Sequence, residues 1–162
     1  MSIHERVRIV KKSLVLVLVL GIASCLILTA AAFQYQGPET ELIALINGER
    51  EAIGVPTLVV NWEVARLARN KSEEMTKHRL FGHESLVYGD PAQTLERFQV
   101  PYSAVGANIA MGQETAQEVL DAWLSSPGHR ANLVNSEFSS AGVGLSWDEN
   151  GIPYWTLILV DS

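Results

Sequence analysis

The most informative stretch of the sequence is WLSSPGHRANL, which occupies residues 123–133. Shortly before it, Thr115 and Glu118 have the spacing of a capping box, so a helix is expected to begin there. The Ser-Pro-Gly sequence at residues 126–128 ends that helix, and His129 lies in the first turn of another. The stretch therefore predicts two consecutive short helices, with a histidine just after the break between them.

The rest of the chain adds helices before this stretch and strands after it. Residues 99–113 are rich in Gly, Ala and Pro and are expected to be irregular. An order of helices followed by a terminal hairpin is typical of an α+β fold or of a layered α-β-α arrangement. The predicted elements are helices over residues 39–53, 61–79 and 91–98 and strands over residues 142–147 and 153–160.

The N-terminal residues have the composition of a membrane-targeting segment. Residues 1–12 contain four basic side chains, whereas residues 14–33 contain no charged side chain. A helix of about 20 residues extends about 30 Å, the thickness of the hydrocarbon core of a bilayer. We therefore expect a cytoplasmic basic segment at residues 1–12 and a transmembrane anchor at residues 13–33. A linker at residues 34–38 would connect this anchor to a domain at residues 39–162.

Two other interpretations of the N-terminal segment stay open. Ala30 and Ala32 form an A-x-A-like cleavage site, which would make the segment a cleaved signal peptide. The residues that end at Cys25 resemble a bacterial lipobox, but the residues after Cys25 are mostly apolar, which favours a small residue within a membrane helix. All three interpretations place the domain outside the cytoplasm, either on the membrane or secreted.

The charge and cysteine content of the domain exclude several classes of protein. From Gln34 onward the chain has 8 basic and 17 acidic residues, a net charge of −9. Such a domain is repelled by phosphate backbones, so we expect no nucleic-acid partner. The single cysteine lies outside the domain, which therefore contains no disulfide. The chain has no CxxC, GxGxxG, P-loop or HExxH pattern, so the common nucleotide and zinc-protease signatures are missing.

Two of the four histidines have a context that favours a shared site. His83 and His129 each follow a glycine near the end of a predicted helix, where the rings can project into one cleft. Neutral imidazole is a common zinc ligand. The two residues lie far apart in the sequence, so two structural histidines that donate to loop carbonyls remain the alternative. Glu118 is either a helix cap or a partner that orients an imidazole, and the sequence leaves both roles open.

Five motifs occur together and point to one family. The sequence resembles prokaryotic members of the CAP superfamily, which groups cysteine-rich secretory proteins, antigen 5 and pathogenesis-related proteins. This resemblance implies a three-layer α-β-α sandwich with a large cleft, where two histidines and two glutamates can take up a divalent metal. The motifs are LINxxR with GVPxL (residues 45–58), AxxKSxEM with FGH (residues 68–83), GANIA (residues 106–110), WLSSPGHRANL (residues 123–133) and GVG with YWT (residues 142–156).

Carried over to this chain, the resemblance makes His83 and His129 the metal ligands and Glu118 one of the two acids. The second acid stands in a Gly-Glu-Asn-Ile-Ala motif, where this chain has Ala107. The missing carboxylate weakens any zinc or magnesium site and removes a candidate general base.

The same motifs place Asn108 and Arg130 beside the cleft. The missing acid favours a non-catalytic module whose cleft binds a metal, a lipid or a protein ligand in the cell envelope. The alternative is a metal-assisted peptidase or esterase in which Glu118 activates water.

Overall fold

The computed structural model describes residues 37–161 of the 162-residue chain. The predictions for the basic segment, the anchor, Cys25 and most of the linker therefore lie outside the described residues. Within residues 37–161, none of the helices combines the length and the apolar character of a membrane span.

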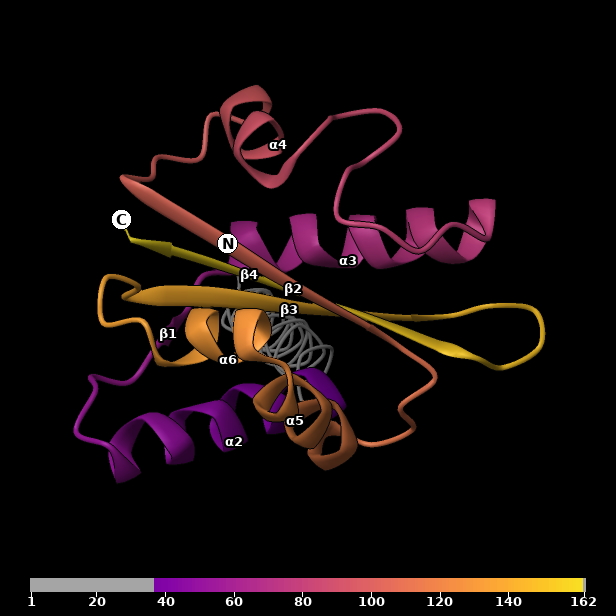
Figure 1. The fold of residues 1–162 in the computed structure, drawn as a ribbon. Helices are drawn as coiled ribbons and strands as arrows, with labels where there is room; N and C mark the ends of the chain where they lie inside the picture. Colours follow the sequence, from indigo (N-terminus) through magenta and orange to yellow (C-terminus); the bar gives the residue numbers. More distant parts are fainter. Residues whose placement is uncertain (1–36, 162) are drawn as a thin grey trace, which may run out of the picture. The chain divides into compact units, whose positions relative to one another are not determined.

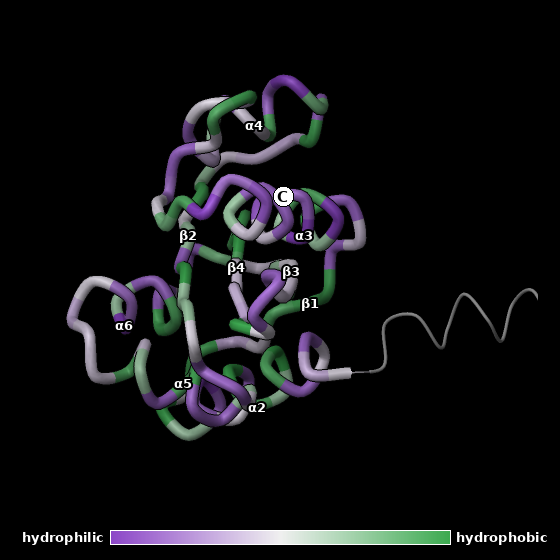
Figure 2. Tube along the Cα trace, turned by 90° about the vertical axis from the view of Figure 1, so that its right-hand side faces the viewer, coloured by the Kyte–Doolittle hydropathy of each residue, from purple (hydrophilic) through white to green (hydrophobic). Residues whose placement is uncertain are grey.

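A four-stranded mixed sheet forms the middle layer (Figure 1). Its strand order is β1-β3-β4-β2, in which β1 pairs with β3 in parallel and the other two pairs are antiparallel. Figure 2 shows the strands in this order between two layers of helices. The strands are β1 (Val59–Val60), β2 (Ala104–Met111), β3 (Ser140–Trp147) and β4 (Pro153–Asp161).

Helices cover both faces of the sheet, so the α+β class and the three-layer arrangement expected from the sequence are confirmed (Figures 1 and 2). One face packs against α2 and α5, with α6 beside α5, and the other face packs against α3 and α4. The helices are α2 (Pro38–Ala52), α3 (Trp62–His78), α4 (Pro91–Arg97), α5 (Ala116–Ser125) and α6 (Pro127–Val134).

Strand β2 corrects the expectation that residues 99–113 are irregular. Ala104–Met111 pairs with β4 over its whole length, although its small residues have a low intrinsic preference for strands. Gly106 suits this strand because a Cβ atom there would lie 2.8 Å from the ring of Phe138. Tertiary packing therefore outweighs the local propensity.

The face of the sheet toward α2 and α5 is a closed apolar core. Trp155, Leu157 and Leu159 of β4 are fully buried there and belong to one hydrophobic cluster with α2 and α5. Trp123 of α5 is 1% exposed, and its indole Nε1 donates to the carbonyl of Ile109 at 3.0 Å. The polar edge of this buried indole thus has a partner, and the rest of the ring packs in the apolar cluster.

On the other face, two glycines of β3 let α3 approach the sheet closely. A Cβ atom on Gly142 or Gly144 would lie 2.1 Å from a backbone nitrogen of α3. The hydroxyl of Ser72 in α3 donates to the carbonyl of Gly144 at 2.9 Å, and a 2.9 Å hydrogen bond links it to the hydroxyl of Thr156. These contacts fix the helix from which the candidate site is built.

Candidate functional site

The structure brings the two predicted histidines together. His83 lies in the loop between α3 and α4, and His129 lies in the first turn of α6. Their ring centroids are 6.3 Å apart and the ring planes are inclined by 43°. The two imidazoles therefore border one site, although 46 positions separate them in the sequence.

Asn108 of β2 binds the backbone of His129. The Asn108 side chain is fully buried, and its Nδ2 donates to the carbonyl of His129 at 3.0 Å. Asn132 Nδ2 donates in turn to Asn108 Oδ1 at 2.8 Å and to the carbonyl of Ala107 at 3.3 Å. Asn108 thus connects α6 to the central sheet, because a buried amide is stable only when its hydrogen bonds are made.

The loop that carries His83 is held by two charged residues of α3. Lys71 Nζ donates to the carbonyl of Glu84 at 2.6 Å, and Glu74 Oε1 accepts from the backbone N–H of Leu86 at 2.5 Å. Lys71 and Glu74 also form an ion pair at 3.8 Å, and each of these side chains is 13% exposed. The helix therefore contacts the loop at positions close to His83.

Within the loop, Ser85 makes a turn. Its hydroxyl Oγ accepts from the backbone N–H groups of Val87 and Tyr88 at 3.1 and 3.0 Å, and its backbone bridges to Gly89. The ring of Tyr88 packs edge-on against Phe98 at 5.1 Å between centroids. These contacts place the loop as a wall opposite α3.

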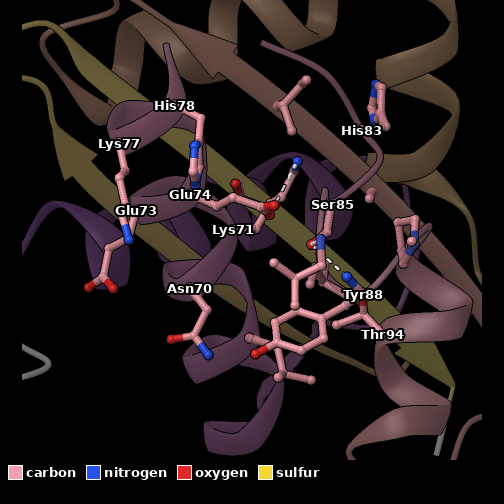
Figure 3. Close-up of a pocket in the computed structure, with 18 residues that line it drawn as sticks. Asn70, Lys71, Glu73, Glu74, Lys77, His78, His83, Ser85, Tyr88 and Thr94 are labelled. Carbon is pink, nitrogen blue, oxygen red and sulfur yellow. Dashed lines mark hydrogen bonds and ion pairs between the residues drawn. The ribbon is translucent and has the colours of Figure 1, made fainter. Parts of the chain in front are cut away.

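A pocket of about 250 Å³ lies between this wall and α3, above the sheet (Figure 3). Its floor is formed by β2 and β4, and its walls by α3 and by residues between His83 and Thr94. The lining combines apolar and polar side chains, and His83 is among them. The floor residues are Ala107, Ile109, Thr156 and Ile158.

The surroundings of His83 lower its pKa from the usual value of 6.5. The main cause is desolvation by the atoms packed around the ring, and the charges of His129 and Lys71 act in the same direction. Desolvation also lowers the pKa of Lys71, while Glu74 and Glu84 act against that shift. His83 is thus mainly neutral at pH 7, with a nitrogen lone pair available as a ligand or hydrogen-bond acceptor.

Of the other predicted site residues, Ala107 lines this pocket, whereas His129, Asn108, Glu118 and Arg130 do not. Glu118 Oε2 accepts from the backbone N–H groups of Glu114 and Thr115 at 2.8 and 3.2 Å. Glu118 therefore has the capping role, one of the two roles that the sequence left open, and its exposed side chain does not line the pocket beside His83. Arg130 is exposed on α6 and does not line this pocket either.

Across residues 37–161, no group of three or more His, Cys, Asp and Glu side chains is arranged to hold a metal ion. The two imidazoles alone can supply two of the three protein ligands that a catalytic zinc site usually has. Ala107 lies at the pocket floor, where its methyl group offers no ligand.

Sequence reasoning missed the roles of Lys71 and Glu74. Both lie in the AxxKSxEM motif, which carried the family resemblance but gave no sign of a contact with residues 84–86. Their spacing of three residues on one helix indicates that they share a face, and two charges that are only 13% exposed are stabilised by partners from another segment.

Comparison with known proteins identifies the family. Residues 43–159 match the model of the cysteine-rich secretory protein family, CAP. The chain therefore belongs to the CAP family, and its domain is of the SCP type found in the structures described below.

Two Bacillus subtilis proteins are similar in sequence. The uncharacterized protein YkwD is 37% identical over 116 residues, which cover 72% of this chain and 45% of YkwD. The uncharacterized membrane protein YlbC is 32% identical over 120 residues, which cover 72% of this chain and 35% of YlbC. This chain thus spans less than half the length of either relative.

Solved structures share the fold. An extracellular protein with an SCP domain from Bacillus anthracis has a TM-score of 0.71 at 28% identity, over 78% of this chain and 41% of that one. A cysteine-rich secretory protein from Staphylococcus aureus has a TM-score of 0.65 at 25% identity, over 79% of this chain and 40% of that one. The domain therefore has the architecture of bacterial SCP domains.

Proposed function

We propose that this chain is a non-catalytic binding module that residues 13–33 hold on the outer side of a membrane. The observation that carries the proposal is the approach of the His83 and His129 ring centroids to 6.3 Å, with His83 in the wall of a pocket whose floor is largely apolar. Such a combination of a concave, largely apolar surface and a few polar groups is typical of a small-ligand site.

The two histidines would hold a divalent metal, with zinc preferred to magnesium. Imidazole nitrogen suits zinc, whereas magnesium favours oxygen ligands and keeps several waters. With His83 and His129 as the only protein ligands, the remaining positions would be open to water or to a ligand. Without an acid at position 107, we expect weak affinity.

The location outside the cytoplasm is supported by the sequence and by the relatives. The apolar segment follows a basic one, the order expected when the downstream domain is translocated. YlbC is named a membrane protein, and the Bacillus anthracis structure is that of an extracellular protein. The acidic domain also makes nucleic acid an unsuitable partner.

The positions of the carboxylates favour binding over hydrolysis. The carboxylate of Glu118 accepts hydrogen bonds at the start of α5 and so would not activate water at the pocket. Glu74 lines the pocket, but one of its oxygens accepts from Leu86 and the other faces Lys71. A hydrolase would need a general base that can reach the reacting water.

Calorimetric titration of zinc into the full chain in detergent micelles tests the proposal. We expect one weak site that is lost in both His83→Ala and His129→Ala. The matched control is His78→Ala, because His78 lines the pocket from α3 without belonging to the proposed ligand pair. Equal zinc binding by all four proteins, or its loss in His78→Ala alone, would contradict the proposed site.

A further inference from the structure

The pocket beside His83 has an apolar floor with open space above Ala107. On the floor, Ala107 pairs with Ile158 across β2 and β4, and Ile109 pairs with Thr156. Because Ala107 ends at a methyl group, the space that a longer side chain would fill belongs to the pocket. This floor can accept the apolar body of a ligand.

Lys71 contributes a positive charge with remaining donor capacity. An ammonium group has three N–H donors. The structure gives Lys71 Nζ one hydrogen bond, to the carbonyl of Glu84, and an ion pair with Glu74 at 3.8 Å, which exceeds hydrogen-bond distance. The carboxylates of Glu74 and Glu84 both interact with this cation, and Nζ keeps N–H donors that can donate to a further anionic group.

Two acids of α3 line the same pocket, but they are placed differently. Glu74 is held by the N–H of Leu86 and by Lys71. Glu73 is exposed and lies with Lys77 toward the outer side of α3, whereas Lys71 and Glu74 point toward the loop (Figure 3). The part of the pocket between α3 and His83 therefore offers an ammonium group and an imidazole as donors, while Asn70 and Lys77 line the pocket from other positions of α3.

We propose that this pocket binds a small organic monocarboxylate. Its carboxylate accepts hydrogen bonds from Lys71 and His83, and its apolar body lies over Ala107 and Ile158. A pocket of about 250 Å³ is smaller than the roughly 300–1,000 Å³ of sites for drug-sized ligands, so the body is one ring or a short aliphatic chain. The inference rests on the proposed binding function, but it needs no metal.

The test compares benzoate with its neutral isostere benzamide. Each is titrated into the 15N-labelled full chain in detergent micelles with a chelator present, and amide shifts of residues 106–109 are followed by NMR. We expect benzoate to bind at least about tenfold more tightly than benzamide, because a charged acceptor strengthens the hydrogen bond to an ammonium. Equal affinities, or no shift at residues 106–109, would overturn the proposal.

Two variants distinguish the contribution of the Lys71 charge from that of the space above Ala107. Lys71→Met should bring the benzoate-to-benzamide ratio close to one, whereas the control Lys77→Met, on the outer side of α3, should keep it. Ala107→Glu should weaken benzoate binding by more than about tenfold, because the new carboxylate occupies the space and repels the ligand. Retention of the benzoate preference in Lys71→Met would contradict the proposal even if Ala107→Glu fails to fold.

Zinc titration of the same samples without chelator distinguishes the proposed metal site from the proposed carboxylate site. Zinc binding that requires both histidines, without any preference for benzoate, would overturn the carboxylate site and leave the proposed metal site standing. A preference for benzoate that depends on Lys71, without zinc binding, would support the carboxylate site and remove the metal from the proposed function.

Discussion

The two faces of the central sheet differ in how completely their helices cover them. Toward α2 and α5, the β4 side chains of Trp155, Leu157 and Leu159 are fully buried in one apolar cluster. Toward α3 and α4, Thr156 and Ile158 of the same strand line a pocket. Because successive side chains of a strand point to opposite faces, one strand supplies both the closed core and the pocket floor. Alternate positions of β4 therefore face the closed core or the pocket, although Thr156 and Ile158 are themselves only 2% and 3% exposed.

The largest effect is expected on the closed face. Trp123→Ala removes a buried indole and its hydrogen bond to Ile109, which should lower the free energy of unfolding by about 3–5 kcal/mol. Chemical denaturation followed by circular dichroism measures this change. The control is Trp147→Ala, since Trp147 is 57% exposed and its loss should cost only about 0.5 kcal/mol. Similar losses in the two variants would contradict the assignment of the core.

A smaller loss is expected where α3 contacts the sheet. Gly144→Ala places a Cβ atom 2.1 Å from the backbone of Arg69, so α3 must move, at a cost of about 1–3 kcal/mol. The control is Gly48→Ala in α2, where a Cβ atom meets nothing within 4 Å and helix propensity should raise stability by about 0.5–1 kcal/mol. If thermal denaturation showed the same change for both variants, the close approach of α3 would be wrong.

Restoring an acid at the pocket floor should strengthen metal binding. Ala107→Glu adds a carboxylate beside the histidines, and we expect the zinc affinity to rise by about tenfold or more. Ala107→Gln is the matched control, because it fills similar space without the charge. Calorimetry that gave Ala107→Glu no advantage over Ala107→Gln would place the zinc elsewhere.

The smallest effect concerns the protonation of His83. Its lowered pKa means that the folded state favours the neutral ring, so this residue's effect on stability is absent above pH 6.5. Below pH 6.5 the unfolded state binds the proton more readily than the folded state does. The free energy of unfolding therefore falls as the pH drops from 6.5 through the lowered pKa of His83. NMR titration of the His83 Cε1 proton should give a pKa below 6.5, and Lys71→Met should raise it, whereas Lys77→Met should not. A pKa at or above 6.5 would contradict the described surroundings of the ring.

Local signals in the sequence were sufficient for most helices. Asn61 caps α3, Asp90 begins α4 with a capping box, and Thr115 and Glu118 form the capping box of α5. These signals act within one turn of chain, so sequence spacing alone reveals them. The terminal hairpin followed in the same way from two apolar runs around a turn.

Contacts between segments that lie far apart in the chain could not be predicted from local sequence signals. Strand β2 forms because β4 pairs with it, and its Gly and Ala residues gave no local sign of a strand. The hydrogen bond from Asn108 to His129 and the contacts of Lys71 and Glu74 with the loop likewise depend on where the sheet places α3 and α6. The Gly-His context of both residues and the family resemblance predicted the meeting of His83 with His129, which sequence spacing could not.

The 15N shifts of the histidine side chains during a zinc titration of the full chain report whether two distant imidazoles form one site. We expect the ring nitrogens of His83 and His129 to shift together, at the same zinc concentrations, while those of His78 do not. Shifts of His83 without His129, or equal shifts of all three rings, would contradict it.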